Sequence, residues 1–309
     1  MAVSRDDKVA LAIVESRIDA ILPETYQDSY EEVQPTSMGS APVRYDGDGR
    51  VAWNEMWASY CDLAIAGGPP HKGMLLEPGA AAEIDAQPER YREVVDEICR
   101  GIAMVTDLEV HESPVRGWVR VECLTDGMAE WLLRAITVEN VAVRPAPLAI
   151  DLPAAPHFRL EKEIKNVVTV VAKTTHYWMS HTSRAHQDAI AQLFEALEEE
   201  FPLVVPGLST DHVAPDTHLF AATSAAESIR EATGLSISPH RYLGWLGIEC
   251  PTIPAAIWMM RAVIVSNVLA RREGTVLFVA VNGALDPRGQ RVSAATIGVH
   301  RLANVAGVL

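Results

Sequence analysis

The sequence predicts an α+β protein with an internal duplication, in which two tandem ferredoxin-like (βαββαβ) units are each preceded by an extra helix. The first observation behind this prediction is a segment that occurs twice, at 117–144 and at 244–271. A shift of 127 residues aligns the two copies without a gap, and 13 of the 28 positions are identical. Chance would give about one or two identities at average composition. The second observation is that strands and helices are expected in the same order around both copies.

The length of 309 residues allows two hydrophobic cores, in agreement with a duplication. We expect residues 1–50 to form an N-terminal helix and a flexible arm that is rich in turn-forming residues. The first α+β repeat is expected at 51–151, and the second repeat with a C-terminal extension at 157–309.

In the first half, apolar spacing and turn residues predict both kinds of element. The helix expected at 88–101 begins with a proline and ends at a glycine, which is typical of helix termini. The strand expected at 142–150 contains Pro145 and Pro147, which places it at the edge of a sheet. The other expected helices are 9–22, 52–66 and 126–141, and the other expected strands are 73–77, 102–110 and 116–123.

In the second half, the β-branched run at 166–173 (NVVTVVAK) predicts a strand. The helix expected at 224–233 ends before Gly234, a typical helix stop. The other expected helices are 183–201 and 254–271, and the other expected strands are 203–205, 235–238, 242–250, 275–281 and 291–299.

Charge and composition argue against several classes of function. The formal net charge of −15 argues against binding to nucleic acid or to an anionic membrane surface. The four cysteines have no CxxC spacing, and together with an acidic N-terminus unlike a signal peptide they indicate a cytoplasmic location. The GxSxG, HExxH, P-loop and strand-following GxGxxG motifs do not occur, so the common hydrolase, zincin and nucleotide-binding signatures are absent from the sequence.

Side-chain alternation along the repeated strand places an aromatic and an acidic residue on one face in both copies. Trp118 and Glu122 share a face in the first copy, as do Trp245 and Glu249 in the second. The aliphatic residues face the helices that cover the other side of such a sheet. We expect the two open faces to enclose a polar cavity in which both tryptophans contact the substrate. The alternative is that the tryptophans only pack and the glutamates only form structural ion pairs.

Two histidines and a lysine are candidates for the chemistry. The loop at 67–73 (GGPPHKG) presents His71 and Lys72 between rigid prolines and flexible glycines, which suits substrate capture or proton transfer. The alternative is a loop that merely caps a helix. His176 follows the strand expected at 166–173, and it is the preferred catalytic histidine because ligands often bind at strand ends.

His176, His181 and His186 resemble a metal-binding set, but their spacing argues against one. Five residues turn a regular helix by about 140°, so the three side chains would not share a face. His186 is moreover expected to face the core with the apolar residues of its helix.

The loop at 211–218 contains His212, Asp216 and His218, which are residue types that bind zinc or iron. A divalent metal is therefore the candidate cofactor, and a solvated acidic loop is the alternative. Arg241 lies at the second expected hairpin, beside the expected cavity, and is a candidate for substrate binding.

These features predict an enzyme that performs general acid–base chemistry on a polar or anionic metabolite in a cavity between the repeats, with metal assistance left open. We expect His176 or His71 to transfer protons. Glu122 or Glu249 would assist, and Lys72 would hold a carboxylate or phosphate group. The alternative is a non-catalytic ligand-binding or assembly protein with pseudo-two-fold symmetry. The expected partners are a small molecule and, in a homo-oligomer, a second copy of the chain.

Overall fold

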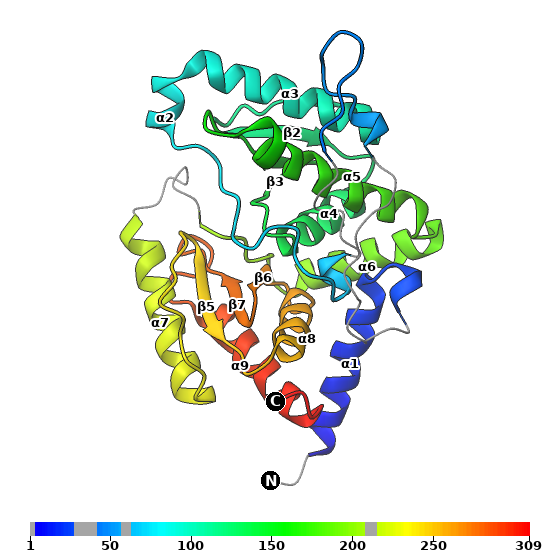
Figure 1. Cartoon of the computed structure of the whole chain (residues 1–309). Helices are drawn as coiled ribbons and strands as arrows, with labels where there is room; N and C mark the ends of the chain where they lie inside the picture. Colours follow the sequence, from blue (N-terminus) through cyan, green and yellow to red (C-terminus); the bar gives the residue numbers. More distant parts are fainter. Residues whose placement is uncertain (1–3, 28–41, 57–62, 208–214) are drawn as a thin grey trace. The chain divides into compact units, whose positions relative to one another are not determined.

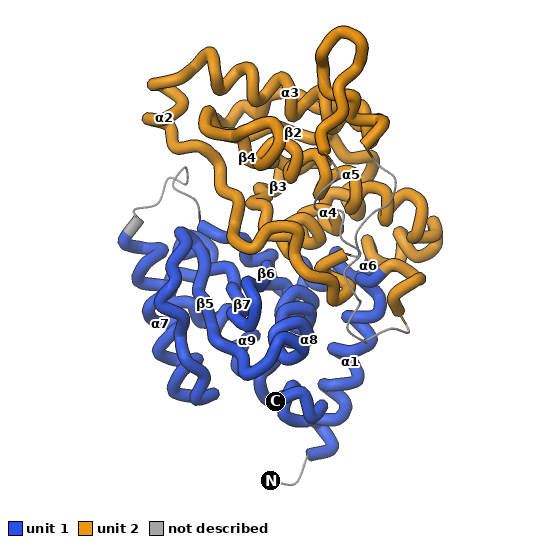
Figure 2. The backbone as a smooth tube through the Cα atoms, in the orientation of Figure 1, with its two compact units in different colours: residues 1–22, 192–309 blue, residues 23–191 orange. Residues whose placement is uncertain are grey.

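The computed structural model describes residues 4–27, 42–56, 63–207 and 215–309. Helices are combined with two small antiparallel sheets, which confirms the α+β class (Figure 1). The chain divides into two compact units (Figure 2). Unit 1 comprises residues 1–22 and 192–309, and unit 2 comprises residues 23–191.

Unit 2 contains α2 (Ala81–Ala86), α3 (Pro88–Thr106), β1 (Val110–Glu112), β2 (Trp118–Glu122), α4 (Asp126–Val138), β3 (Arg144–Ala146), β4 (Ala149–Pro153) and α5 (Lys165–Ser180). It also contains short 3-10 turns at Glu24–Tyr26, Trp53–Glu55 and Ala64–Ala66, and a π-helical turn at Leu160–Ile164. The strands form one antiparallel sheet in the order β1-β2-β4-β3. Strand β2 alternates as its sequence predicts, because Val119 and Val121 are fully buried whereas Arg120 between them is partly exposed.

Unit 1 contains α1 (Arg5–Ile21), α7 (Pro215–Thr233), β5 (Trp245–Glu249), α8 (Ile253–Ile264), β6 (Ala270–Glu273), β7 (Val276–Ala280) and α9 (Gln290–Val305). Its three strands form an antiparallel sheet in the order β5-β7-β6. Helix α9 packs against α1, α7 and α8, and α7 lies beside β5 (Figure 1). The core of this unit therefore includes a helix from each end of the chain.

The two compact units are divided at other positions than the expected repeats, whose domain boundaries stay a prediction. The boundary falls within α6 (Arg184–Glu200) instead of at the linker expected between the repeats at 152–156. Helix α5, expected in the second repeat, packs against α3 and α4 of unit 2. Helix α1, expected to belong with the arm, packs in unit 1.

Matching positions of the repeated segments have the same local structure. Thr125 and Thr252 each cap a helix, because the side-chain oxygen accepts a hydrogen bond from the backbone N–H three residues later. Asn140 and Asn267 follow these helices with left-handed φ values of 61° and 58°, a conformation that asparagine tolerates better than most residues. The segments are thus built on shared capping and turn residues.

The strand order around the two segments is also alike. In unit 2 the sheet runs β1-β2-β4-β3, and in unit 1 it runs β5-β7-β6. In the place that corresponds to β1, Ile237 forms an isolated antiparallel bridge to Ile248 of β5. Superposition of the two units stays a prediction.

The ferredoxin-like order is not confirmed. In that order the strand before the first helix would pair in the centre of the sheet, yet the segment expected at 73–77 forms only an isolated parallel bridge between Leu76 and Val141. Strand β4 takes the central place beside β2, because a turn in which Leu148 has a φ of 53° folds it back on β3. Strand β3, which contains Pro145, lies at the sheet edge as predicted.

Two segments expected as strands are helices. Residues 166–173 lie within α5 and residues 291–299 within α9. Val167, Val168 and the other valines of α5 are fully buried, so the apolar residues of this helix run without a clear helical period. A buried helix and a buried strand have the same continuous apolar pattern, and the β-branched composition favoured the wrong one.

Several helix boundaries also differ from the expected ones. Helix α3 continues to Thr106, so the strand expected at 102–110 is reduced to Val110–Glu112. The helix expected at 254–271 ends at Ile264, and its last residues form β6. The helix expected at 52–66 is represented by two 3-10 turns, and residues 57–62 between them lie outside the described part of the chain.

Across the described ranges, no helix combines the length and apolar character that a membrane crossing requires.

Candidate functional site

An open cavity of about 560 Å³ lies within unit 1, between helix α7 and the segment that leads into β5. Its wall from α7 includes His218, Glu227 and Arg230. Its opposite wall is formed by residues 237–247, which include Arg241 and Trp245. Cavities of this size commonly hold small molecules.

The β5 side of the cavity is an aromatic wall fixed from behind by a buried arginine. Tyr242 and Trp245 line the cavity, and the guanidinium carbon of Arg271 lies 4.5 Å and 5.0 Å from their ring centroids. The same carbon lies 4.3 Å from the centroid of Phe278, and Arg271 Nη1 donates to Glu273 Oε1 at 2.6 Å. Burial lowers the pKa of Arg271. Cation–π contacts and one ion pair therefore hold this wall in place.

A glycine in the strand beside the cavity makes room for the side chains of Phe278 and Ser238. Gly247 lines the cavity, and a Cβ atom there would lie 2.9 Å from Phe278 Cε1 and 2.9 Å from Ser238 Cβ. Both distances are too short for a real Cβ atom. Phe278 and Ser238 can therefore lie this close to the strand only because residue 247 is a glycine. In unit 2 the matching position of β2 is Arg120.

Two arginines and one glutamate give the charge of the cavity lining. Arg230 and Glu227 are exposed on α7, and Arg241 is exposed on the opposite wall. The lining therefore carries an excess of positive charge in a chain whose net charge is −15. Arginine side chains recognise carboxylate and phosphate groups through paired N–H donors, so this lining favours an anion.

Two histidines, His218 and His240, also line the cavity. His218 is 3% exposed, and its Nδ1 accepts a hydrogen bond of 3.0 Å from the backbone N–H of Gly283. A ring that accepts at Nδ1 is neutral and carries its proton on Nε2. Gly207 permits this position, because a Cβ atom there would lie 2.2 Å from His218 Nδ1. His240 is exposed, and its ring packs against Tyr242 with centroids 4.6 Å apart.

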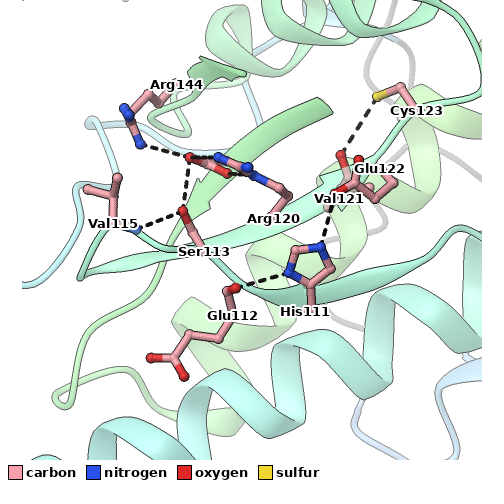
Figure 3. Close-up of polar contacts among 10 residues, drawn as sticks. His111, Glu112, Ser113, Val115, Arg120, Val121, Glu122, Cys123 and Arg144 are labelled. Atoms are coloured by element: carbon pink, nitrogen blue, oxygen red, sulfur yellow. Dashed lines mark hydrogen bonds and ion pairs between the residues drawn. The ribbon is translucent and has the colours of Figure 1, made fainter. Parts of the chain in front are cut away.

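The corresponding face of unit 2 carries a row of charged side chains instead (Figure 3). Asp151 on β4 is fully buried and accepts from Arg120 Nε at 2.8 Å and from Arg144 Nη1 at 2.9 Å. Ser113 Oγ donates to the same carboxylate at 3.0 Å. The hydrogen bond to Asp151 raises the pKa of Arg120. The donors around Asp151 satisfy its charge, which is typical of a structural network.

The predicted loop residues His71 and Lys72 lie in a buried polar cluster of unit 2. Glu139 Oε1 accepts from Lys173 Nζ at 2.8 Å, and its Oε2 accepts from the backbone N–H of His71 at 2.9 Å. The His71 Nε2 lies 3.0 Å from Asn166 Oδ1, to which it donates. Burial, followed by the charge of Lys173, lowers the pKa of His71 to about 4. Burial also lowers the pKa of Lys72.

This cluster has the character of a loop anchor. Lys173 and Glu139 are 1% and 0% exposed and neutralise each other. The backbone of Lys72 is held as well, because its N–H donates to Glu139 O and its C=O accepts from Asn140 Nδ2 at 2.8 Å. The cluster therefore fixes the loop at 67–73, whichever role His71 and Lys72 have.

The structure brings some predicted site residues together and separates others. Trp245, Arg241 and His218 line the same cavity of unit 1. Trp118 is 1% exposed in unit 2, where Glu122 accepts from His111 Nε2 at 2.9 Å.

Glu249 is exposed at the end of β5 and does not line the unit 1 cavity. His176 belongs to unit 2 and lies inside α5, so the strand end that motivated its choice does not exist. The expected convergence of Glu249 and His176 in one pocket stays a prediction.

The predicted metal set is only partly described. His212 lies outside the described residues, and Asp216 and His218 lie two positions apart on α7. Side chains two apart on a helix point to different sides. Among the residues that the structure places, no three His, Cys, Asp or Glu side chains gather as metal ligands would.

The buried thiols do not offer a nucleophile. Burial raises the pKa of Cys123 to about 12 and that of Cys250 to about 11. Both therefore remain protonated near neutral pH and behave as small apolar side chains.

The sequence reasoning missed the α7 wall and the aromatic support. Glu227 and Arg230 are three residues apart, which places them on one helix face, but only the fold shows what this face lies against. Arg271 was expected at the end of a helix and lies on β6.

No protein-family model matches the chain, and no similar protein was found among curated proteins or among solved structures.

Proposed function

We propose that the chain binds a small anionic metabolite in the unit 1 cavity and performs general acid–base chemistry on it. The observation that carries this proposal is the pairing of Arg230 and Arg241 with the aromatic wall of Tyr242 and Trp245 around about 560 Å³. Arginines attract and orient a carboxylate or phosphate group, and the aromatic rings cover its apolar part. These contacts support a site within unit 1, beside Trp245 and Arg241.

His218 and His240 are the candidates for proton transfer. The hydrogen bond from Gly283 to Nδ1 supports a fixed tautomer for His218, in which Nε2 carries the proton. His240 lies on the opposite wall and is accessible to solvent, so it can take up and release protons during turnover. The alternative is a non-catalytic ligand-binding protein, in which the same residues only hold the anion.

We also propose that the two units derive from one duplicated unit whose copies have diverged. Shared residues include the caps Thr125 and Thr252. On the sheet face Trp118 and Trp245 are shared, whereas Arg120 and Asp151 are replaced by Gly247 and Phe278. One copy keeps a filled charged face and the other has acquired a cavity, which supports the assignment of ligand binding to unit 1.

The test is a thermal-shift screen with succinate, citrate and glycerol phosphate, each at several concentrations. We expect at least one anion to raise the melting temperature, because a ligand that binds only the folded state stabilises it. Arg241→Ala should abolish the shift. Arg116→Ala is the matched control, since Arg116 is an exposed arginine of unit 2 that pairs with Asp85, and it should retain the shift.

An equal response of both variants, or no response of the native chain to any anion, would refute the binding proposal. Catalysis is tested separately by incubating the bound anion with the protein and following it by NMR. Turnover that is lost in His240→Gln while binding persists supports the enzyme. Binding without any turnover supports the alternative.

A further inference from the structure

Two histidines of unit 2 approach each other closely at the end of helix α5. Helix α5 ends at Ser180, and His181 caps it with a φ of −120° and a ψ of 8°. This change of direction brings His181 Nε2 to 3.2 Å from His176 Nε2. A regular helix would have kept the two rings apart, as their spacing of five residues predicts.

The separation of the two rings can be compared with that expected for a straight hydrogen bond between the nitrogens and with that expected for a shared metal ion. The ring centroids are 5.0 Å apart and the ring planes are inclined by 72°. Two rings in a straight N–H···N hydrogen bond would have centroids about 5.4 Å apart, because each centroid lies about 1.1 Å behind its nitrogen. The observed separation is shorter, so the two nitrogens do not lie on a straight line between the ring centroids.

A common point at metal-ligand distance accounts for both separations. Zinc binds imidazole nitrogen at about 2.0–2.1 Å, so each ring centroid would lie about 3.2 Å from the ion. Nitrogens 3.2 Å apart around such a point then require centroids about 5.0 Å apart and an N–metal–N angle of about 103°. The observed 5.0 Å agrees with this value, and the angle is close to tetrahedral.

We propose that His176 and His181 bind a divalent transition-metal ion through their Nε2 atoms. Imidazole ligands suit Zn²⁺, Cu²⁺ and Ni²⁺, so the ion belongs to this class and not to the oxygen-preferring Mg²⁺ or Ca²⁺. Both rings are partly exposed. Two protein ligands leave coordination positions for water or a bound molecule, as in an open site.

The surroundings hold the pair in position. The backbone N–H of His181 donates to Tyr177 O at 3.0 Å, and the Tyr177 ring packs against His181 with centroids 5.0 Å apart. The Tyr177 hydroxyl lies 2.7 Å from that of Tyr26. Ligands that are ordered before the metal arrives bind it more tightly, because less side-chain freedom is lost.

The experiment is isothermal titration of the full chain with Zn²⁺ after treatment with a chelator that is then removed. We expect one ion per chain, and His176→Ala and His181→Ala should each weaken this binding by about tenfold or more. His157→Ala is the control, because His157 is an exposed histidine of the same unit that pairs with Glu83 instead, and it should bind like the native chain.

Paramagnetic resonance of the native chain with one equivalent of Cu²⁺ gives a second measurement that needs no variant. The native chain should give nitrogen hyperfine splitting from two imidazole ligands. Each alanine variant should lose this two-ligand pattern. His176→Gln and His181→Gln, checked by circular dichroism, replace the alanine variants should these fail to fold. No ion bound by the native chain, or unchanged affinity in both His176 and His181 variants, would overturn the proposal.

Discussion

One position of the sheet differs most clearly between the two units. In unit 2, Asp151 on β4 is buried between two arginines. In unit 1, the residue 127 positions later is Phe278 on β7, over which Arg271 stacks. The same place in a similar sheet thus holds either a satisfied carboxylate or an aromatic ring.

The neighbours of this position differ in a coordinated way. Arg120 of unit 2 corresponds to Gly247 of unit 1, and Arg144 corresponds to Arg271. The arginine on the edge strand is kept, but Arg144 pairs with Asp151, whereas Arg271 pairs with Glu273 and also stacks on three aromatic rings. Gly247 leaves room for Phe278 and Ser238 beside the strand, and Gly247 and Trp245 line the cavity of unit 1. The proposal that unit 1 binds a ligand therefore depends on residues of the sheet face and not on those at caps and turns.

The largest effect is expected when Asp151 is removed. Asp151→Ala leaves Arg120 and Arg144 without their shared carboxylate, and the free energy of unfolding should fall by about 3 kcal/mol. Urea denaturation measures this loss. The control Asp85→Ala removes an exposed pair with Arg116 and should cost less than about 1 kcal/mol. Equal costs for the two variants would mean that the row in unit 2 is not a structural network.

The buried cluster around His71 should make stability depend on pH. The pKa of His71 is about 4 in the folded chain, against an ordinary value of 6.5, so the unfolded chain takes up its proton first as the pH falls. The stabilisation is therefore fully present above about pH 6.5 and is lost between pH 6.5 and 4, by about 2–3 kcal/mol. Urea denaturation across this pH range should show the loss of stability in the native chain and a smaller loss in His71→Gln. The control His157→Gln should show the same pH dependence as the native chain.

The next variant introduces at Gly247 of unit 1 the arginine that unit 2 has at the matching position, Arg120. Gly247→Arg places a side chain against Phe278 and Ser238, so the free energy of unfolding should fall by about 1–3 kcal/mol through overpacking. The new side chain also fills the cavity, and the thermal shift with anions should disappear. The reciprocal change Arg120→Gly in unit 2 should leave that shift intact. A Gly247→Arg variant that still responds to anions would place binding elsewhere.

The smallest effect concerns the edge arginine. Arg271→Lys keeps the charge but loses the planar group that stacks on Tyr242, Trp245 and Phe278, so we expect a loss of about 1–2 kcal/mol. Arg144→Lys in unit 2 keeps an ion pair with Asp151 and should cost less. Thermal melting of both variants measures the difference, and an equal or reversed order would contradict the cation–π account.

The sequence predicted the features that depend on local patterns. The repeated strand and helix were predicted because 13 of 28 positions are identical at a fixed shift of 127 residues, and the structure shows that the shared Thr125 and Thr252 cap matching helices. The edge position of β3 followed from Pro145, which cannot donate to a sheet ladder. These properties depend on residues that are close together in the sequence, so they can be predicted without knowledge of the fold.

Features that depend on tertiary packing were missed. The strand expected at 166–173 is part of α5, because burial on nearly all sides removed the helical period. The pairing of His176 with His181 depends on where α5 ends, and the expected regular spacing excluded it. The α7 wall of the cavity lies on a different element from Trp245 and Arg241, so only the fold connects them.

The central claim is that ligand binding belongs to unit 1 and not to the matching face of unit 2. The seven tryptophans of the chain can be labelled with 5-fluorotryptophan and observed by fluorine NMR, with Trp118→Phe and Trp245→Phe assigning the two matched signals. On titration with the anion that gives the largest thermal shift, the Trp245 signal should move and saturate while the Trp118 signal stays in place. A saturating shift of Trp118 with Trp245 unchanged would contradict the account.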